Sequence, residues 1–295
     1  MTPTAKPDIS IIIPTRDRPD LLARAIASAL AQDDAGTLEV IVVDDASSPP
    51  ATVPPDPRVR LVRHAVDRGG AAARNSGLAA ARGRWVTWLD DDDELVPGGL
   101  AACLAALAGS DLPPPVAAVA ALEVVDAEGR VTALRRPPTL PRGRYWNLET
   151  VPAGRSFQVK QSLVIERSVV AGIGGFDERF RAHVHSDLFL RLNPVCSILG
   201  VDRPGYRFHR HGGASVTGDP VLRAKSLAAL IDKHRAVLER RARPFAGMLI
   251  DHAAVCAHDG RRAEALRWRL RAARYDPVRV GRTVLGGWLR GRRLL

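Results

Sequence analysis

The sequence lacks the features that mark several large classes of protein. It has no run of about 18 or more apolar residues, so a membrane-spanning helix is not expected. It shows no signal-peptide-like apolar stretch before Pro14, so secretion is not expected either. The 3 cysteines are far apart and form no C-x-x-C pair. They are predicted to pack in the core, not to form a disulfide framework or a thiolate zinc site, and the protein is expected to be cytoplasmic.

Two common nucleotide-binding signatures are also absent. The chain contains neither a G-x-x-x-x-G-K-[ST] loop nor a G-x-G-x-x-G turn. These absences disfavour a P-loop hydrolase and a dinucleotide-dependent oxidoreductase.

Excess positive charge is scarce outside the last part of the chain. The formal net charge is +11. Residues 241–295 contain 13 arginines against 4 acidic residues, a net charge of +9, which leaves +2 for residues 1–240. We therefore expect no nucleic-acid partner for the main domain.

The first 110 residues alternate between two hydrophobic patterns. Apolar runs rich in β-branched residues predict buried strands at residues 9–13, 39–43, 59–62 and 84–89. Apolar residues at helical spacing predict helices at residues 21–30, 70–81 and 100–107. This alternation predicts a doubly wound α/β sheet.

The pattern changes after residue 110. Residues 116–125 and 131–134 flank a turn signature and predict a β-hairpin. Residues 135–160, rich in Pro, Arg and Gly, predict an irregular surface segment suited to substrate binding. Residues 225–240 and 245–274 have helical patterns. We therefore expect an α/β domain followed by a helical extension.

Polar residues follow three of the predicted strands. Thr15 and Arg16 follow the first, Asp44 and Asp45 the second, and the aspartates of residues 90–93 the fourth. Ligands of open α/β sheets bind beyond the carboxyl ends of the strands, so these residues should share one crevice. Adjacent carboxylates repel by about 4 kcal/mol at an effective dielectric of about 20. A bound Mg²⁺ or Mn²⁺ would relieve that repulsion, and a solvated acidic turn is the alternative.

A glycine-containing segment leads into the predicted helix at 70–81. Asp67 lies three residues before Gly70, which is at the helix entrance. Glycine there permits close approach of a ligand to the backbone, and the helix N-terminus favours anions. Arg74, one turn further, could reach a phosphate or a sugar hydroxyl, and Asn75 lies beside it. This entrance is a candidate phosphate or sugar site.

Five segments together resemble the family 2 glycosyltransferases. They are SIIIPTRDRPDLLARAIASALAQ, EVIVVDDAS, DRGGAAARNSGLAAARGRWVTWLDDDDEL, GIGGFDERF and SDLFLRL, and they cover about residues 8–215. The resemblance implies a GT-A fold, with a doubly wound, mixed and mostly parallel sheet flanked by helices. It also implies a transferase domain at residues 1–220, with a nucleotide-sugar half at 1–110 and an acceptor half at 111–220. The helical patterns and the arginines after residue 220 predict a basic helical extension at residues 221–295.

The resemblance implies roles for the first two sets of strand-end residues. Pro14, Thr15 and Arg16 would border the nucleotide of the donor, while Asp44 and Asp45 would face its base and ribose. A UDP-sugar donor is favoured, with GDP and dTDP open, because a carboxylate that faces a base does not define which base binds.

The acidic run matches the family's Asp-x-Asp element. Asp90 and Asp92 would form it, with Asp92 as the main ligand of Mg²⁺ or Mn²⁺ and Asp91 near the ribose or sugar. Asp93 and Glu94 are expected to cap the next helix or to support the site. The cation would stabilise the charge on the leaving diphosphate, and the sugar would be transferred with inversion.

The expected position of the general base departs from the family pattern. The family places a carboxylate, usually in a Glu-Asp pair, shortly after the GGFDE segment, and here RFRAHVHSDLFLRL follows with no such pair. Asp187 is the preferred base because a carboxylate suits the task. His185 is the alternative, since a neutral imidazole accepts a proton near pH 7. In a third interpretation His183 and His185 only line the acceptor pocket.

His209 lies in a segment that the resemblance makes a loop over the diphosphate. It is expected to contact phosphate or metal, with a solvated loop histidine as the alternative. Trp146, in the irregular segment, is expected either to stack on an acceptor sugar or to cover the sheet.

The end of the chain has a basic amphipathic composition. Residues 279–295 combine apolar side chains with arginines, which suits anionic lipid headgroups, although glycines weaken a helix there. A terminal hairpin packed on the main domain is the alternative. Peripheral contact with the inner face of the cell membrane would suit a lipid-linked or envelope-polysaccharide acceptor.

The predicted function is a metal-dependent inverting transferase that glycosylates a hydroxyl of a polysaccharide, glycolipid or glycoconjugate. Two other functions are alternatives to it. A sugar-phosphate nucleotidyltransferase also uses an α/β sheet and a divalent ion, but IPTRDRPDLL lacks the glycine-rich loop that it would want. A protein that only binds a nucleotide-sugar is the nonenzymatic alternative, because the base position departs from the family pattern.

Overall fold

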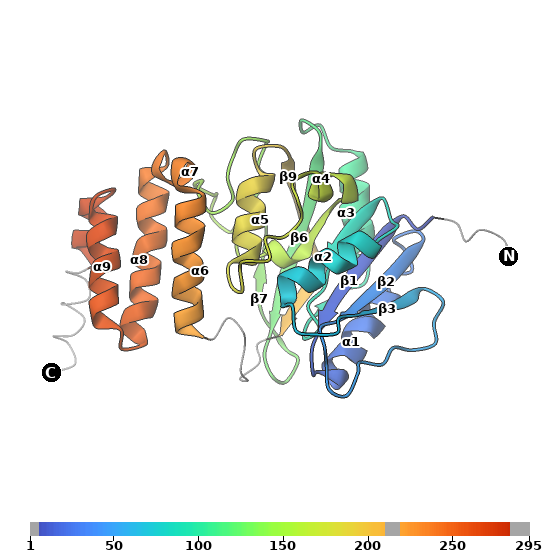
Figure 1. Ribbon diagram of the computed structural model, residues 1–295. Helices are drawn as coiled ribbons and strands as arrows, with labels where there is room; N and C mark the ends of the chain where they lie inside the picture. The colour runs from blue at the N-terminus through green and yellow to red at the C-terminus, as the bar shows by residue number, and fades with distance from the viewer. Residues whose placement is uncertain (1–5, 210–218, 284–295) are drawn as a thin grey trace. The chain divides into compact units, whose positions relative to one another are not determined.

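The computed structural model describes residues 6–209 and 219–283 of the chain (Figure 1). Their contacts define two compact units. The first consists of the described parts of Met1–Trp146 and Thr150–Ala214, and the second of the described parts of Asn147–Glu149 and Ser215–Leu295.

The described part of the first unit is built on one nine-stranded sheet. Its strands are β1 (Ile9–Thr15), β2 (Leu38–Asp44), β3 (Val59–Arg63), β4 (Trp85–Trp88), β5 (Glu94–Leu95), β6 (Val116–Val125), β7 (Val131–Arg135), β8 (Leu163–Glu166) and β9 (Ser197–His209). The order is β3-β2-β1-β4-β8-β6-β9-β5, and β7 pairs with β6. The helices are α1 (Pro19–Leu30), α2 (Gly70–Ala80), α3 (Gly99–Ala108), η1 (Lys160–Ser162), α4 (Arg167–Gly172) and α5 (Val184–Leu192).

The N-terminal half has the predicted alternation of strands and helices. The strands β1 to β4 pair with one another in parallel. The β-branched residues of β1 and β2 are buried on both faces, as the continuous apolar runs predict. Thr15 pairs with Asp44, and the N–H of Leu89 donates to the carbonyl of Ile12, so the carboxyl ends of β1, β2 and β4 lie side by side.

The C-terminal half makes the sheet mixed. The predicted hairpin forms between β6 and β7, which are antiparallel. The strand β8 is antiparallel to both β4 and β6, and β9 is parallel to β6. The short strand β5 pairs antiparallel with β9 and brings Glu94 opposite Arg207 and Leu95 opposite Tyr206. This pairing carries the acidic residues after β4 against β9.

The irregular segment after β7 covers the core through Trp146. This side chain is buried, its indole N–H donates to the carbonyl of Phe157 at 2.8 Å, and its ring packs against Phe157 and Phe189. Of the two expectations for Trp146, sheet cover is confirmed and stacking on an acceptor sugar is wrong, because a buried ring presents no face to a ligand.

The second unit is helical in its described part. Its helices are α6 (Pro220–Lys233), α7 (Arg235–Glu239), α8 (Ala242–His258) and α9 (Arg262–Ala273). The predicted helical stretch at 245–274 is broken after α8, where Gly260 adopts a φ of 76°. Figure 1 shows α6, α8 and α9 side by side, and no described helix is long and apolar enough to cross a membrane. Most of the predicted basic amphipathic segment, residues 284–295, lies outside the described residues.

Candidate active site

The acidic run lies in the turn between β4 and β5. One carboxylate oxygen from each of Asp90, Asp92 and Asp93 lies within 4.8 Å of the other two. Asp91 accepts a hydrogen bond from the Thr15 hydroxyl at 2.8 Å. The structure therefore brings together Asp90 and Asp92, as predicted, and adds Asp93 as a third convergent carboxylate.

Two arginines hold these carboxylates in place. Arg74, from α2, forms an ion pair with Asp90. Arg18, just before α1, donates to Asp91 at 3.1 Å and to Asp92 at 3.0 Å. Arg74 is one of the predicted site residues. Arg18 is not among them, although it lies in the TRDRP segment of the family resemblance.

The charges on Asp90 are balanced by these neighbours. Burial raises the pKa of Asp90, but the nearby Arg74, His185 and Arg18 outweigh burial, so the pKa of this carboxyl is lowered. Asp90 is therefore ionised at neutral pH and remains available to a second cation. His185, on α5, and Arg74 both pack against the Phe176 ring, which brings α5 close to the arginine that pairs with Asp90.

The neighbours of Asp91 and Asp93 do not offset the effect of burial on their pKa values. Burial raises the pKa of Asp91 to about 6, although the Thr15 hydroxyl and Arg18 oppose the shift. Burial, reinforced by repulsion from Asp90, raises the pKa of Asp93 to about 8. Ionisation of all four carboxyls would therefore leave more negative charge than the nearby side chains neutralise, and a bound cation would favour that ionised state.

The strand β9 supports the acidic turn from the other side. The buried Tyr206 hydroxyl donates to Asp93 at 2.9 Å and accepts the Asp90 N–H at 3.2 Å. The His209 N–H donates to Asp93 at 2.9 Å, and its ring lies 2.6 Å from a carboxylate oxygen of Glu94. Asp93 and Glu94 thus support the site and do not cap α3, which begins after Gly98. Tyr206 is not among the site residues predicted from the sequence, where its spacing from His209 is the only signal.

Asp44 and Asp45 are buried and engaged with the backbone of adjoining loops. Asp44 accepts the N–H groups of Ser47 at 2.8 Å and Ala51 at 3.1 Å. Asp45 accepts those of Arg68 at 2.9 Å and Gly69 at 2.7 Å. Both carboxylates therefore shape the loops around the strand ends, and their predicted contact with base and ribose remains a prediction.

His64 completes this arrangement and was missed in the sequence. Its ring nitrogens lie 2.7 Å from Asp45 and 2.8 Å from the Ser76 hydroxyl. The buried imidazole thus links the end of β3 to α2.

The glycine-containing entrance to α2 is close to the end of β1. Arg16 forms an ion pair with Asp67, and Arg181 lies 3.5 Å from the same carboxylate. Gly69 has a φ of 87°, a conformation that residues with a Cβ rarely adopt, so the turn before Gly70 favours glycine. Pro14, in β1, pairs with Val43 of β2. The predicted site residues Arg16 and Asp67 therefore do meet.

Asn75 contacts the segment that precedes α5. Its amide group donates to the carbonyl of Phe176 at 2.8 Å and accepts the Phe176 N–H at 2.8 Å. It also donates to Glu178 at 3.0 Å. Asn75 therefore positions the GGFDE segment, a structural role that the sequence did not indicate.

The two candidate bases lie in the first turn of α5 with different surroundings. Asp187 is fully buried. The Arg191 Nε–H donates to its carboxylate at 2.9 Å, and the Arg191 Nη2 lies 2.8 Å from the same oxygen. His185 is partly exposed, packs edge-on against Phe176 at 5.6 Å and interacts electrostatically with Asp90. The structure thus places His185 against Phe176, whose ring Arg74 also contacts, and Asp187 in a buried ion pair.

The comparisons with known proteins agree with this geometry. Residues 10–147 match the family described as "Glycosyl transferase family 2", so this region is a family 2 glycosyltransferase domain. The fold resembles that of S. aureus TarS 1–349 in complex with UDP-GlcNAc, with a TM-score of 0.63 at 16% identity over 92% of this chain and 82% of that one. The predicted family and GT-A fold are therefore confirmed.

Two curated relatives are bacterial polysaccharide proteins. The succinoglycan biosynthesis protein ExoO of Rhizobium meliloti (strain 1021) is 44% identical over 130 residues, which are 42% of this chain and 36% of ExoO. The putative colanic acid biosynthesis glycosyl transferase WcaA of Escherichia coli (strain K12) is 39% identical over 105 residues, which are 34% of this chain and 37% of WcaA. The matches thus span less than half of these relatives.

Proposed function

We propose that the protein transfers a sugar from a nucleotide-diphosphate-sugar, with UDP-sugars favoured, to a hydroxyl of a growing polysaccharide or glycolipid. The observation that carries this proposal is the convergence of Asp90, Asp92 and Asp93 at the carboxyl end of β4. The polysaccharide names of ExoO and WcaA and the UDP-GlcNAc bound by TarS support it. The family match favours this reading over a nucleotidyltransferase.

The same carboxylates fit a Mg²⁺ or Mn²⁺ ion. Both cations prefer oxygen ligands, and this turn offers carboxylate oxygens only. We propose Asp92 and Asp90 as the ligands, with Asp93 either ligating or accepting hydrogen bonds beside them. A divalent ion there would stabilise the negative charge that develops on the leaving diphosphate.

The nucleotide is proposed to lie against the ends of β1 and β2. Thr15 and Arg16 border this region, and Asp67 fixes the Arg16 side chain. We propose that Asp44 and Asp45 contribute mainly by holding the loops that form its walls, because backbone N–H groups already occupy their oxygens. Arg74 is proposed to act near the diphosphate through its ion pair with Asp90.

His185 is proposed as the general base of an inverting reaction. The base must reach the acceptor hydroxyl on the sugar face opposite the leaving diphosphate. Asp187 is buried and paired with Arg191, whereas His185 is partly exposed and packs against Phe176, whose ring Arg74 also contacts. A neutral His185 would accept the hydroxyl proton, and Asp187 would orient the first turn of α5.

Turnover and binding measurements test these roles. The protein should bind and turn over a nucleotide-sugar only with Mn²⁺ or Mg²⁺ present, and EDTA should abolish both. H185A should spare donor binding and lower kcat by about 10²–10⁴-fold, while D187N, if folded, should retain turnover within about tenfold. An inactive but folded D187N together with an active H185A would show that Asp187 is the base.

Peripheral membrane contact is proposed for the C-terminal unit. Leu266 and Leu270, one turn apart on α9, are 56% and 61% exposed, and the exposed Arg262, Arg267 and Arg274 lie on the same helix or just after it. Apolar side chains among arginines suit an anionic bilayer surface. Sedimentation with phosphatidylglycerol vesicles should be strong, weak with phosphatidylcholine vesicles, and reduced by the double substitution L266E/L270E. Equal sedimentation with both vesicles would contradict the proposal.

A further inference from the structure

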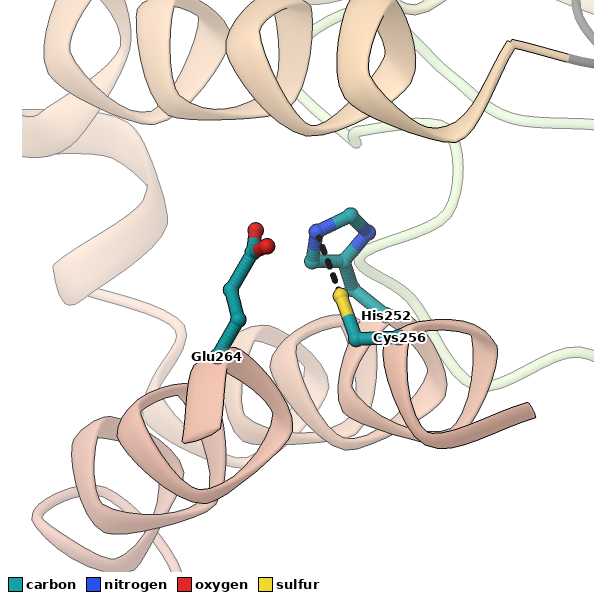
Figure 2. Close-up of side chains that lie close together, drawn as sticks. All are labelled: His252, Cys256 and Glu264. Atoms are coloured by element: carbon teal, nitrogen blue, oxygen red, sulfur yellow. Dashed lines mark hydrogen bonds between the residues drawn. The ribbon is translucent and has the colours of Figure 1, made fainter. Parts of the chain in front are cut away.

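Three side chains with different ligand chemistry converge between α8 and α9. His252 and Cys256 are one turn apart on α8, and Glu264 is in the first turn of α9 (Figure 2). One nitrogen, the sulfur and one carboxylate oxygen of these residues all lie within 4.8 Å of one another. His252 and Cys256 are buried, and Glu264 is partly buried. This cluster belongs to the second unit and is separate in the chain from the acidic turn.

The spacing of the first two ligands suits zinc. The His252 Nε2 and the Cys256 Sγ are 3.5 Å apart. A tetrahedral zinc ion with a Zn–N bond of about 2.0–2.1 Å and a Zn–S bond of about 2.3 Å places these atoms about 3.5 Å apart. The helix therefore already holds both atoms at the separation that zinc requires, and Glu264 needs only a side-chain movement toward them.

We propose that His252, Cys256 and Glu264 bind one Zn²⁺ ion, with water as the fourth ligand. One thiolate and one carboxylate neutralise the two charges of the ion, and a neutral imidazole adds none. The bound site would therefore bury no net charge, which removes the main cost of placing a divalent ion between helices. Three protein ligands and a water are an established zinc coordination.

Neighbouring residues orient the carboxylate as in other metal sites. The Arg261 guanidinium donates to one oxygen of Glu264 at 2.6 Å, and the Trp268 indole donates to the other at 3.3 Å. Each oxygen keeps a second lone pair for a metal. Arg261 also pairs with Asp259 at 3.2 Å, so its charge remains partly compensated when zinc draws on Glu264.

A structural role without metal is the competing explanation. The Cys256 thiol would then donate a weak hydrogen bond to His252, and the cluster would only pin α8 to α9. Burial raises the pKa of the Cys256 thiol, so zinc binding must release its proton to solvent as the Zn–S bond forms. This proton release and the Zn–S bond separate the two explanations.

Cobalt substitution tests the proposal with a signal specific to sulfur. The protein, purified without metal, is titrated with Co²⁺, and we expect a thiolate-to-cobalt charge-transfer band in the near ultraviolet that saturates at one ion per chain. Zn²⁺ should displace the cobalt and remove the band. Oxygen ligands at the acidic turn give no such band, so D92A should retain it whether or not the proposed transferase function is correct.

Matched variants identify the ligands. C256S should abolish the band, and H252A and E264Q should each weaken Co²⁺ binding at least tenfold. C103S, which removes another buried cysteine, should keep the band at full intensity. Far-ultraviolet circular dichroism checks that each variant is folded. A wild-type protein with no thiolate band, or a folded C256S that retains it, would overturn the proposal.

Discussion

Two acidic stretches end neighbouring parts of the same sheet, yet their carboxylates have different partners. Asp44 and Asp45, at the end of β2, accept hydrogen bonds from backbone N–H groups of the loops beside them. The aspartates after β4 are held by side chains instead, chiefly Arg18, Arg74 and Tyr206. Backbone donors therefore predominate around the first stretch, although Asp45 also contacts His64, and side-chain donors predominate around the second.

The pKa values follow this difference. Burial raises the pKa of Asp44, but the hydroxyl and N–H of Ser47, the N–H of Ala51 and the charge of Arg63 outweigh it, so its pKa is lowered. Asp93, also buried, has a pKa raised to about 8, because Asp90 adds to the effect of burial. The backbone and side-chain donors around Asp44 together thus satisfy a buried carboxylate, whereas the carboxylate cluster after β4 leaves charge for a bound cation.

The largest predicted effect is on catalysis at the second stretch. D92A should lower kcat by about 10²–10³-fold or more, because a ligand of the charge-stabilising ion is lost. Asp92 is about a third exposed, so the free energy of unfolding should change little. Turnover with a UDP-sugar and Mn²⁺, and urea unfolding, measure the two quantities. D33A, which alters an exposed acid on the loop after α1, is the control and should keep wild-type turnover.

A large predicted effect on stability belongs to the first stretch. D45A should lower the free energy of unfolding by about 3 kcal/mol, because the N–H groups of Arg68 and Gly69 and the ring of His64 lose a buried charged partner. Urea denaturation measures the change. A D45A protein as stable as wild type would show that the loop finds other acceptors and that the two stretches are alike.

The pH dependence of stability should have opposite signs at the two stretches. The pKa of Asp44 is lower in the folded state, so its stabilisation is present above its usual pKa of 3.8 and is lost as pH falls through the folded value. The pKa of Asp93 is raised, so its stabilising contribution is present below 3.8 and is lost as pH rises to about 8. In EDTA, D93N should flatten the decline in stability between about pH 4 and 8.

Divalent cations provide the control for this prediction. Mn²⁺ should oppose the decline in the wild-type protein, because it favours the ionised carboxylates of the acidic turn. D44N should instead lower stability by a similar amount throughout pH 5–8. If D93N and D44N gave the same pH profile in EDTA, the distinction between the stretches would fail.

The smallest predicted effect is at the contact between β1 and the acidic turn. T15V should lower the free energy of unfolding by about 1 kcal/mol through loss of the Thr15 hydroxyl bond to Asp91. T37V, which removes an exposed hydroxyl bonded to Asp8, is a matched control and should cost less. Equal losses in the two variants would argue against a special need for donors at the acidic turn.

The sequence predicted what depends on local pattern. The β-branched runs of β1 and β2 require burial on both faces, and the parallel sheet follows from the helices between them. Acids at the ends of β2 and β4 could be assigned to one edge for the same reason. The break after α8 was missed, since Gly260 can end a helix or be tolerated within one.

The rest depends on contacts between residues far apart in the chain. The path of a loop, such as the one before α2, determines whether an aspartate lies next to a backbone N–H or next to a cation. The hydrophobic periodicity of the sequence does not predict the path of a loop. Tyr206 reaches Asp93 only because β5 pairs with β9, a pairing of two residues on one side. Likewise, the exposure of His185 and the burial of Asp187 depend on how the first turn of α5 is oriented, because residues two positions apart point to different sides of a helix.

The contact between Asn75 and Phe176 has a consequence for how such enzymes could be recombined. The Asn75 amide binds both backbone groups of Phe176, and a Cβ on Gly175 would lie 2.6 Å from the Asn75 oxygen. Because Asn75 binds main-chain atoms, this contact does not depend on the side chains of the residues after Gly175. A chimera that joins this nucleotide half to another protein's acceptor half should therefore assemble correctly wherever asparagine and glycine are retained at this seam.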